Sequence, residues 1–219
     1  MTRGRRCSAS HPTLTHELAL SELGYARVAG VDEAGRGAWA GPVMAAAVIL
    51  PLAPDIAEAL RGVNDSKVLS PAQRAAFRET IARVATAFAI GAATAQEIDA
   101  LGIVGATRLA MARAVAGLPV QPDALIIDAV RLPDLPIPQR VFNFADSISL
   151  SVAAASILAK TERDAWMQQL DAAHPGYGFG RHKGYGTRAH QQALRAQGVS
   201  PAHRRSFGPV AEMLPPASA

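Results

Sequence analysis

The chain has 219 residues, which is enough for one well-buried domain and short for two, and its 49% hydrophobic content excludes global disorder. A formal net charge of +4 and a pI of about 9.7 agree with a polyanionic partner but do not require one. The single cysteine, Cys7, excludes an intrachain disulfide and a Cys/His zinc site, so a reducing, cytoplasmic setting is the default expectation. The longest apolar run, 43–50, is too short to span a bilayer, and we expect no membrane association.

The amino-terminal part predicts a tail followed by a hairpin. Residues 1–24 are polar and basic, which predicts a flexible tail. The apolar run at 27–33 predicts a buried strand that ends in two acids. The run at 43–50 predicts its antiparallel partner across a short glycine-rich link.

Helices and strands alternate in the rest of the chain. Ser70, Pro71 and Gln73 form a helix-start pattern with a capping box. The expected elements are a helix at 70–84, a strand at 87–93, a helix from about 95 interrupted near Gly102 and Gly105, strands at 124–128 and 141–145, a long helix from 147 to about 170, and short helices near 188–195 and 209–214. This order predicts an α/β domain with a mixed sheet over 25–210, followed by a tail at 211–219.

Acidic residues follow several of the predicted strands. Asp32 and Asp128 end strands that we expect to be parallel, Glu33 adjoins Asp32, and Asp146 follows the fifth strand. Ligand sites in such sheets lie at the carboxyl ends of the strands. Clustered carboxylates raise one another's pKa, and two divalent cations would resolve that repulsion. Mg²⁺ prefers oxygen ligands, and a pair of ions can hold the attacking and leaving oxygens of a phosphodiester.

The residue types leave alternatives open for each acid. Adjacent strand side chains point to opposite faces, so Asp32 and Glu33 share a site only if the strand already turns at Glu33 or if Glu33 uses its main-chain carbonyl. Gly35 favours the turn. Taken alone, Asp128 is compatible with a turn residue, and Asp146 is better explained as a helix cap.

A basic segment occupies the carboxyl-terminal part. Residues 172–211 contain no acid but hold several arginines and histidines and a lysine. Such clustering is typical of a phosphate-backbone contact and equally of a solvated basic surface. This segment alone therefore does not decide whether the protein binds nucleic acid.

Several short motifs together resemble the ribonuclease HII family, and they cover roughly residues 28–210 in the family's order. They are VDEAGRG at 31–37 with AGPV at 40–43, NDSK at 64–67 with LS at 69–70, AAASILAK at 153–160 with RD at 163–164, HKGYGT at 182–187 with His190, and HRRSF at 203–207.

The resemblance implies a ribonuclease H-like fold, in which helices flank a five-stranded mixed sheet and a helical carboxyl-terminal extension at 172–210 covers the substrate. It implies Mg²⁺ or Mn²⁺, as two ions during catalysis, at Asp32, Glu33, Asp128 and Asp146. It also implies hydrolysis by water of the RNA strand in RNA/DNA hybrids, and nicking of DNA duplexes 5′ to an embedded ribonucleotide in ribonucleotide excision repair. By resemblance, the products would carry 5′-phosphate and 3′-hydroxyl ends, and we expect a monomer.

The resemblance and the residue types suggest substrate contacts. Gly35, Arg36 and Gly37 allow main chain to approach the 2′-hydroxyl that separates RNA from DNA. By resemblance, Tyr185 packs on the sugar at the RNA–DNA junction; alone, it is better explained as a surface packing residue. Candidate phosphate or backbone contacts are Lys67, Ser156, Lys160, Arg163, Lys183, Arg204 and Arg205. For the stripe of Ser156, Lys160 and Arg163, a solvated helix face with Lys160 paired to Asp164 is an equal alternative.

The sequence departs from the family pattern at three positions near the acids. Ala129 stands where glycine is usual, and Phe144 and Ala145 stand where Lys-Gly is usual; Ala38 replaces a common proline as well. Three rival classes remain: a non-catalytic nucleic-acid-binding module, a related nuclease such as ribonuclease HIII or a junction resolvase, and a glycosidase. Retention of all four acids argues against the first, the short amino-terminal segment against ribonuclease HIII, and the basic loop against the glycosidase.

Overall fold

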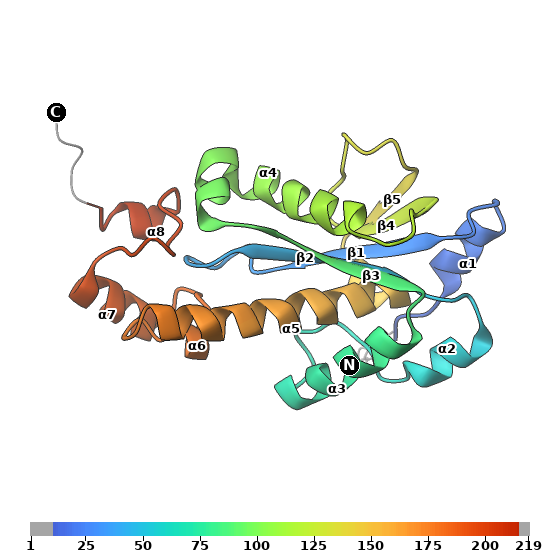
Figure 1. The fold of residues 1–219 in the computed structure, drawn as a ribbon, viewed down its shortest axis with the longest axis horizontal. Helices are drawn as coiled ribbons and strands as arrows, with labels where there is room; N and C mark the ends of the chain where they lie inside the picture. The colour runs from blue at the N-terminus through green and yellow to red at the C-terminus, as the bar shows by residue number, and fades with distance from the viewer. Residues whose placement is uncertain (1–10, 215–219) are drawn as a thin grey trace, which may run out of the picture.

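A computed structural model describes residues 11–214 and contains a five-stranded sheet in the order β3-β2-β1-β4-β5 (Figure 1). The strands are β1 (Val28–Ala34), β2 (Val43–Ile49), β3 (Ala87–Ala93), β4 (Ala124–Asp128) and β5 (Gln139–Phe142). The β1–β2 and β2–β3 pairs are antiparallel, whereas β4 is parallel to both β1 and β5. The predicted α/β class with a mixed sheet is confirmed.

Helices cover both faces of the sheet (Figure 1). One face packs against α4 (Ala95–Ala116), and the other packs against α5 (Leu150–Ala173), with α2 (Pro54–Ala59) and α3 (Pro71–Val84) on the same side as α5. The alternation of β2 divides its side chains between two cores: Ala45 and Ala47 join the α4 core, whereas Ala46 and Val48 join the α5 core.

Two strand glycines allow these helices to lie directly on the sheet. A Cβ atom at Gly30 would lie 2.2 Å from the carbonyl carbon of Ser151 in α5. A Cβ atom at Gly91 would lie 2.1 Å from the carbonyl oxygen of Ala110 in α4. Since both contacts are with backbone that cannot move aside, glycine is required at one point on each face.

The predicted helix signals agree with the structure at α3 and α4. Ser70 and Gln73 form the capping box of α3, and Gly102, at φ 68°, interrupts α4. The long helix α5 begins at Leu150, later than predicted, because Ser149 caps it. Strand β5 ends at Phe142, whereas the predicted strand ended at 145.

The predicted tail is wrong for residues Thr15–Ser21, which form helix α1. Glu17 of this helix is 1% exposed, and its Oε1 accepts hydrogen bonds from the hydroxyls of Ser149 and Ser151 and from the Ser151 amide. The segment thus covers the start of α5. Residues 1–10 of the predicted tail, and 215–219 of the predicted carboxyl-terminal tail, lie outside the described residues.

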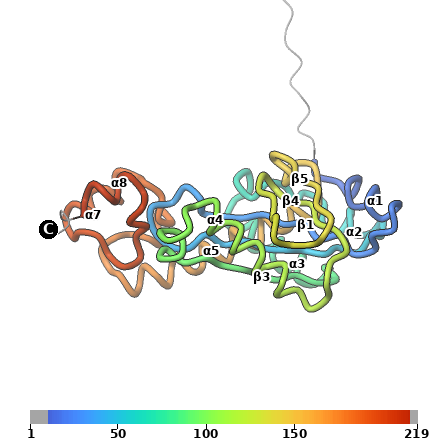
Figure 2. The backbone as a smooth tube through the Cα atoms, turned by 90° about the horizontal axis from the view of Figure 1, so that it is seen from above, coloured from blue at the N-terminus to red at the C-terminus, as the bar shows by residue number. Residues whose placement is uncertain are grey.

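The basic segment forms three short helices, α6 (Phe179–His182), α7 (Arg188–Gln197) and α8 (Gly208–Ala211). Of these, α7 and α8 lie at one end of the molecule, and β4, β5 and α1 lie at the other end (Figure 2). Within residues 11–214, no helix has both the length and the apolar character needed to cross a bilayer.

Candidate active site

Three carboxylates converge where β1 and β4 separate. Parallel pairing of these strands ends at Val31 and Ile127, one residue before Asp32 and Asp128. Asp32, Glu33 and Asp128 each place one carboxylate oxygen within 4.8 Å of the others. The strand ends that the sequence predicted to meet therefore do meet.

Glu33 reaches this cluster with its side chain, so a main-chain ligand is not needed to bring it there. The strand still pairs with β2 through Ala34 and turns only at Gly35, at φ 95°. The amide of Glu33 donates to Asp32 Oδ1 at 2.7 Å, and Arg36 Nη1 donates to Glu33 Oε1 at 3.2 Å. The other oxygen, Glu33 Oε2, is buried and has no hydrogen-bond partner among the described residues.

Asp146 lies on a 3-10 turn, η1 (Ala145–Ser147), between β5 and α5. The turn is joined to the cluster by the Ala145 amide, which donates to Asp128 Oδ1 at 2.7 Å. Asp146 is 3% exposed and does not cap α5, since Ser149 does. The helix-cap interpretation of Asp146 is therefore wrong.

Lys67 forms an ion pair with Asp146. Its Nζ lies 3.9 Å from Asp146 Oδ2 and 3.6 Å from Asp65 Oδ1. Asp65 is a further carboxylate beside Asp146, and it was not among the candidate residues although it belongs to the NDSK motif. Its only distinguishing signal was that position in the motif.

Burial and mutual repulsion disfavour the charged forms of these acids. Burial, then the charges of Glu33, Asp128 and Asp146, raise the pKa of Asp32 well above its ordinary value. Burial also raises the pKa of Glu33, against the opposing effect of Arg36. Burial and the neighbouring Asp65 raise the pKa of Asp146 to about 6. An acidic cluster with these shifts attracts positive charge.

The carboxylates open into a cleft of about 490 Å³ that contains many of the predicted substrate contacts. Its wall includes Gly35, Arg36, Gly37, Lys67, Lys160 and Tyr185. A Cβ atom at Gly37 would lie 4.0 Å from the Tyr185 ring, so the glycine loop and the tyrosine border the same space. The side chain of Tyr185 is 39% exposed there.

The expected phosphate contacts of Arg163 and Arg204 require correction, because both side chains are completely buried. Arg163 donates to the carbonyls of Pro42, Lys183 and Ala40. Arg204 donates to the carbonyls of Gly41, Arg36, Gly35 and Pro42. These guanidinium groups hold the glycine loop in place, and Arg163 also lies 5.5 Å from the centre of the Tyr185 ring.

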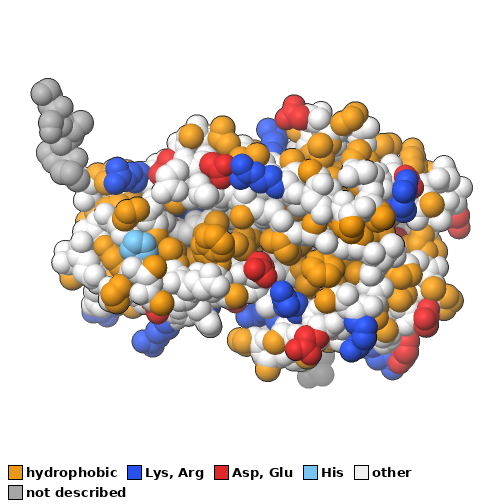
Figure 3. Space-filling model, in the orientation of Figure 1, with side chains coloured by type: hydrophobic (Ala, Val, Ile, Leu, Met, Phe, Trp, Pro, Cys, Tyr) orange, Lys and Arg blue, Asp and Glu red, His pale blue; other side chains and the backbone are white. Residues whose placement is uncertain are grey.

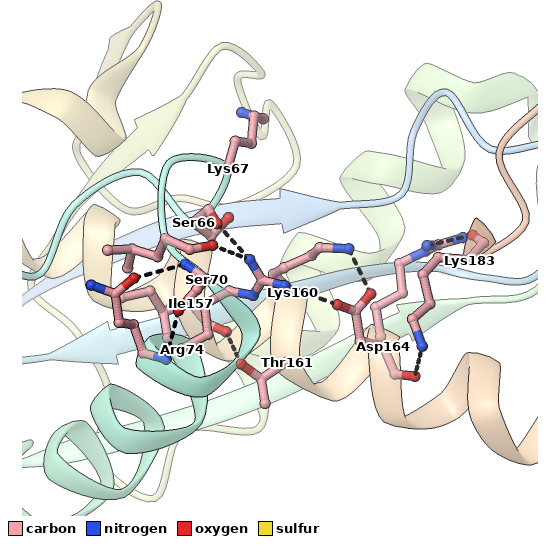
Figure 4. Close-up of polar contacts among 12 residues, drawn as sticks. Ser66, Lys67, Ser70, Arg74, Ile157, Lys160, Thr161, Asp164 and Lys183 are labelled. Carbon is pink, nitrogen blue, oxygen red and sulfur yellow. Dashed lines mark hydrogen bonds and ion pairs between the residues drawn. The ribbon is translucent and has the colours of Figure 1, made fainter. Parts of the chain in front are cut away.

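The predicted polar stripe on α5 lies beside the loop before α3 (Figure 4), and of its three residues Lys160 lines the cleft. Ser156 is buried and donates to the Ser66 hydroxyl at 2.9 Å. Lys160 pairs with Asp164, which Arg74 also contacts at 3.5 Å, as the alternative interpretation predicted. The solvated helix face of that interpretation is wrong, because Ser156 and Arg163 are buried. Lys183 Nζ reaches the carbonyl oxygen of Asp164 at 3.4 Å.

Arg205 is exposed but does not line the carboxylate cleft. It borders a separate hollow with Gln96 and Asp99, and its amide donates to Asp99. On the face drawn in Figure 3, Lys and Arg side chains are scattered among apolar and neutral ones. Since Arg204 is buried, clustering of basic residues in the sequence does not translate directly into a basic surface.

A buried histidine network supports Tyr185 from behind. The Ser200 amide donates to His203 Nδ1 at 3.0 Å, so the other ring nitrogen of neutral His203 carries the proton and donates to His190 Nε2, also at 3.0 Å. His190 Nδ1 then donates to the Tyr185 carbonyl at 3.0 Å. Burial lowers the pKa of both His190 and His203 to about 4. The motifs contained these histidines, but nothing in the sequence indicated that they contact each other.

Fold and site together define a class: a ribonuclease H-like domain with a carboxylate cluster at the carboxyl ends of adjacent strands. The family model described as Ribonuclease HII matches residues 29–210. A ribonuclease HII of Roseiflexus castenholzii is 54% identical over 94% of this chain and 92% of its own, and one of Chloroflexus aurantiacus is 51% identical over 93% and 96%. The crystal structure of a ribonuclease H2 from Pyrococcus horikoshii matches 85% of this chain and 96% of its own, with a TM-score of 0.71 and 25% identity.

The chain belongs to the ribonuclease HII family. It is a ribonuclease H, an endonuclease that cleaves RNA in RNA/DNA hybrids. The family assignment made from the sequence motifs is confirmed.

Proposed function

We propose that Asp32, Glu33, Asp128 and Asp146 hold two divalent cations, Mg²⁺ or Mn²⁺, for hydrolysis of a phosphodiester by water. The enzyme would cut the RNA strand of hybrids and nick DNA duplexes 5′ to a lone ribonucleotide, leaving 5′-phosphate and 3′-hydroxyl ends. The observation that carries the proposal is the convergence of Asp32, Glu33 and Asp128 within 4.8 Å, with Asp146 in the same cleft.

The donor set fits hard divalent cations. All the candidate ligands are carboxylate oxygens, and Glu33 Oε2 is buried without a hydrogen-bond partner, which is costly unless an ion or solvent satisfies it. Burial, and then the crowded negative charge of the neighbouring acids, raises the pKa of Asp32, and cations would neutralise that charge. When bound, the ions would polarise a water and the scissile phosphate and stabilise both the attacking and leaving oxygens.

The remaining cleft residues would orient the substrate. Gly35 and Gly37 bring bare main chain to the cleft, where it can meet a 2′-hydroxyl, and the exposed Tyr185 ring offers a surface for the sugar. Lys67, with 77% of its side chain exposed, is placed to contact a phosphate beside the carboxylates. Lys160 would contribute positive charge at the α5 side of the cleft. Lys183 does not line the cleft and would act through the loop that presents Tyr185. Arg163 and Arg204 would act indirectly, by fixing the glycine loop.

The biological setting follows from this activity. We propose a cytoplasmic, monomeric enzyme whose catalytic domain spans 25–210 and whose substrates include the ribonucleotide-containing duplexes of ribonucleotide excision repair. The segment 172–210 would form the substrate-binding extension, because it contributes Tyr185 to the cleft.

Three labelled duplexes test this proposal: an RNA/DNA hybrid, a DNA duplex with one ribonucleotide, and an all-DNA duplex of the same sequence. Each is incubated with Mg²⁺, Mn²⁺ or a chelator, and the ends are mapped. We expect metal-dependent cleavage of the first two, with the nick 5′ to the ribonucleotide. Cleavage in chelator would refute the metal assignment. Tight binding without cleavage under either metal would instead favour a non-catalytic module.

A further inference from the structure

Phe144 is the most exposed large hydrophobic side chain of residues 11–214, with 75% of its surface accessible. It is not on a remote surface, because it lines the carboxylate cleft together with Asn143 and Ala129. It also lies two residues before Asp146. A large apolar ring at the edge of an acidic cleft gains nothing from burial in the folded protein.

The backbone at Phe144 is also unfavourable for an aromatic residue. Its φ and ψ are 59° and 41°, in the left-handed region, which costs a side chain with a Cβ atom roughly 1 kcal/mol or more. Of the described residues, the non-glycines with positive φ are Ala129, Phe144 and Lys183. The first two line the cleft, and Lys183 precedes Tyr185 by two residues, so backbone strain is concentrated at this site.

The fold requires the left-handed turn but not the ring. The turn directs the Ala145 amide to Asp128 Oδ1, and the Phe144 carbonyl accepts from the amide and hydroxyl of Ser147. Apart from the Asp128 carboxylate and the Ser147 hydroxyl, these groups are main-chain atoms. None of them belongs to the Phe144 ring. Glycine at position 144 would make the same turn without strain.

We infer that Phe144 is a substrate-contacting residue whose ring packs on the sugar of a nucleotide beside the scissile phosphate. The inference rests on the proposed function, which places that phosphate at the carboxylates. A sugar is favoured over a base because contact with a base face inside a duplex would require unstacking, whereas sugar edges line the wide, shallow minor groove of an A-like hybrid.

An apolar contact has a signature that a phosphate contact lacks. A lysine or arginine that contacts phosphate releases counterions, so its loss lowers the dependence of affinity on salt. Loss of an aromatic contact weakens binding without changing that dependence. Lys67 and Phe144 therefore provide two different kinds of contact in the same cleft, and their variants are distinguishable by salt titration.

The test measures dissociation constants for the hybrid and for the single-ribonucleotide duplex by fluorescence anisotropy at several salt concentrations, with Mg²⁺, in an Asp32→Asn background that prevents cleavage. We expect Phe144→Gly to weaken binding about five- to tenfold, the order expected for the loss of one aromatic contact with a nucleotide, with an unchanged salt slope. Phe144→Leu should fall between. Lys67→Ala should lower the slope by about one.

Phe88 on the edge strand β3 supplies the matched control, because it is also a partly exposed phenylalanine but does not line the cleft. Phe88→Leu should bind as the parent does. The melting temperature of Phe144→Gly should hold or rise, since glycine relieves the strain. Unchanged affinity in Phe144→Gly would overturn the inference, as would a changed salt slope or a melting temperature lower by several degrees. Failure of the wild-type enzyme to cleave would instead refute the proposed function.

Discussion

The carboxylate cluster differs from the two buried arginines, Arg163 and Arg204, in how its charge is satisfied. The acids at the strand ends remain together at an open cleft, where Arg36 and Lys67 are the cations that pair with them among the described residues. Arg163 and Arg204 are instead buried, and seven hydrogen bonds to main-chain carbonyls satisfy their guanidinium groups. The charge of the proposed reaction centre is thus largely unpaired, whereas the buried arginines are fully hydrogen-bonded and fix the loop beside it.

The largest expected effect concerns that support. Arg204→Met should destabilise the protein by about 3–5 kcal/mol, because it leaves the carbonyls of Gly35, Arg36 and Gly41 buried without this donor. Denaturant unfolding measures the change. The neighbouring Arg205→Met is the control, and as an exposed substitution it should alter stability by less than about 0.5 kcal/mol. Equal effects of the two variants would refute the distinction between a buried support and a surface cation.

A second prediction concerns acid stability. His190 and His203 have pKa values of about 4 in the folded protein, below the ordinary value of 6.5, so the unfolded chain binds more protons between these values. Stability contributed by these neutral histidines is complete above about pH 6.5 and is lost as the pH falls towards 4. The loss amounts to about 3 kcal/mol for one such histidine.

His203→Gln removes one of the two titrating groups, so stability of this variant should depend less steeply on pH between 6.5 and 4. Urea unfolding at several pH values gives both curves, and the difference between them cancels the titration of the carboxylates. Parallel curves for the variant and the wild type would show that the histidine network does not control acid stability.

The third prediction concerns the cleft. Asp32→Asn removes a buried carboxylate that its neighbours repel, so the metal-free variant should be more stable than the metal-free wild type at pH 7. Addition of Mn²⁺ should raise the melting temperature of the wild type and raise that of the variant less, since binding to the folded state stabilises it. A lower stability of the metal-free variant would contradict the account of crowded charge.

The smallest expected effect belongs to Lys67. Its side chain is largely exposed, so Lys67→Ala should leave stability nearly unchanged and weaken substrate binding by about 1 kcal/mol, roughly fivefold. The charges of Asp65 and Asp146 outweigh the effect of burial and raise the pKa of Lys67, so it remains protonated across the neutral range. The wild type should bind substrate more tightly than Lys67→Ala at low salt, and this difference in affinity should shrink as the salt concentration rises. A uniform advantage at all salt concentrations would exclude a phosphate contact.

The sequence predicted local features well where a short segment determines the outcome. The capping box at Ser70 and Gln73 and the interruption at Gly102 depend on neighbouring residues, and both are present. The convergence of Asp32 and Asp128 followed from parallel strands ending at one edge. These features need only local chemistry and sheet topology.

The predictions from sequence were wrong where contacts with a distant segment determine the local structure. Helix α1 is short and has weak periodicity, and it is stabilised by the contact of Glu17 with Ser149 and Ser151, more than 130 residues away in sequence. Arg204 likewise looked like a surface cation because the carbonyls that bind it are more than 160 residues away. Neither contact leaves a pattern in the sequence around the residue concerned.

The most direct test of the central claim compares cleavage rates of the wild type and Asp32→Asn on a duplex with one embedded ribonucleotide, with Mg²⁺ and with Mn²⁺. We expect the wild type to nick 5′ to the ribonucleotide only when metal is present, and Asp32→Asn to be slower by at least about a thousandfold. A variant that nicks at a rate close to that of the wild type would show that the carboxylate cluster is not the reaction centre.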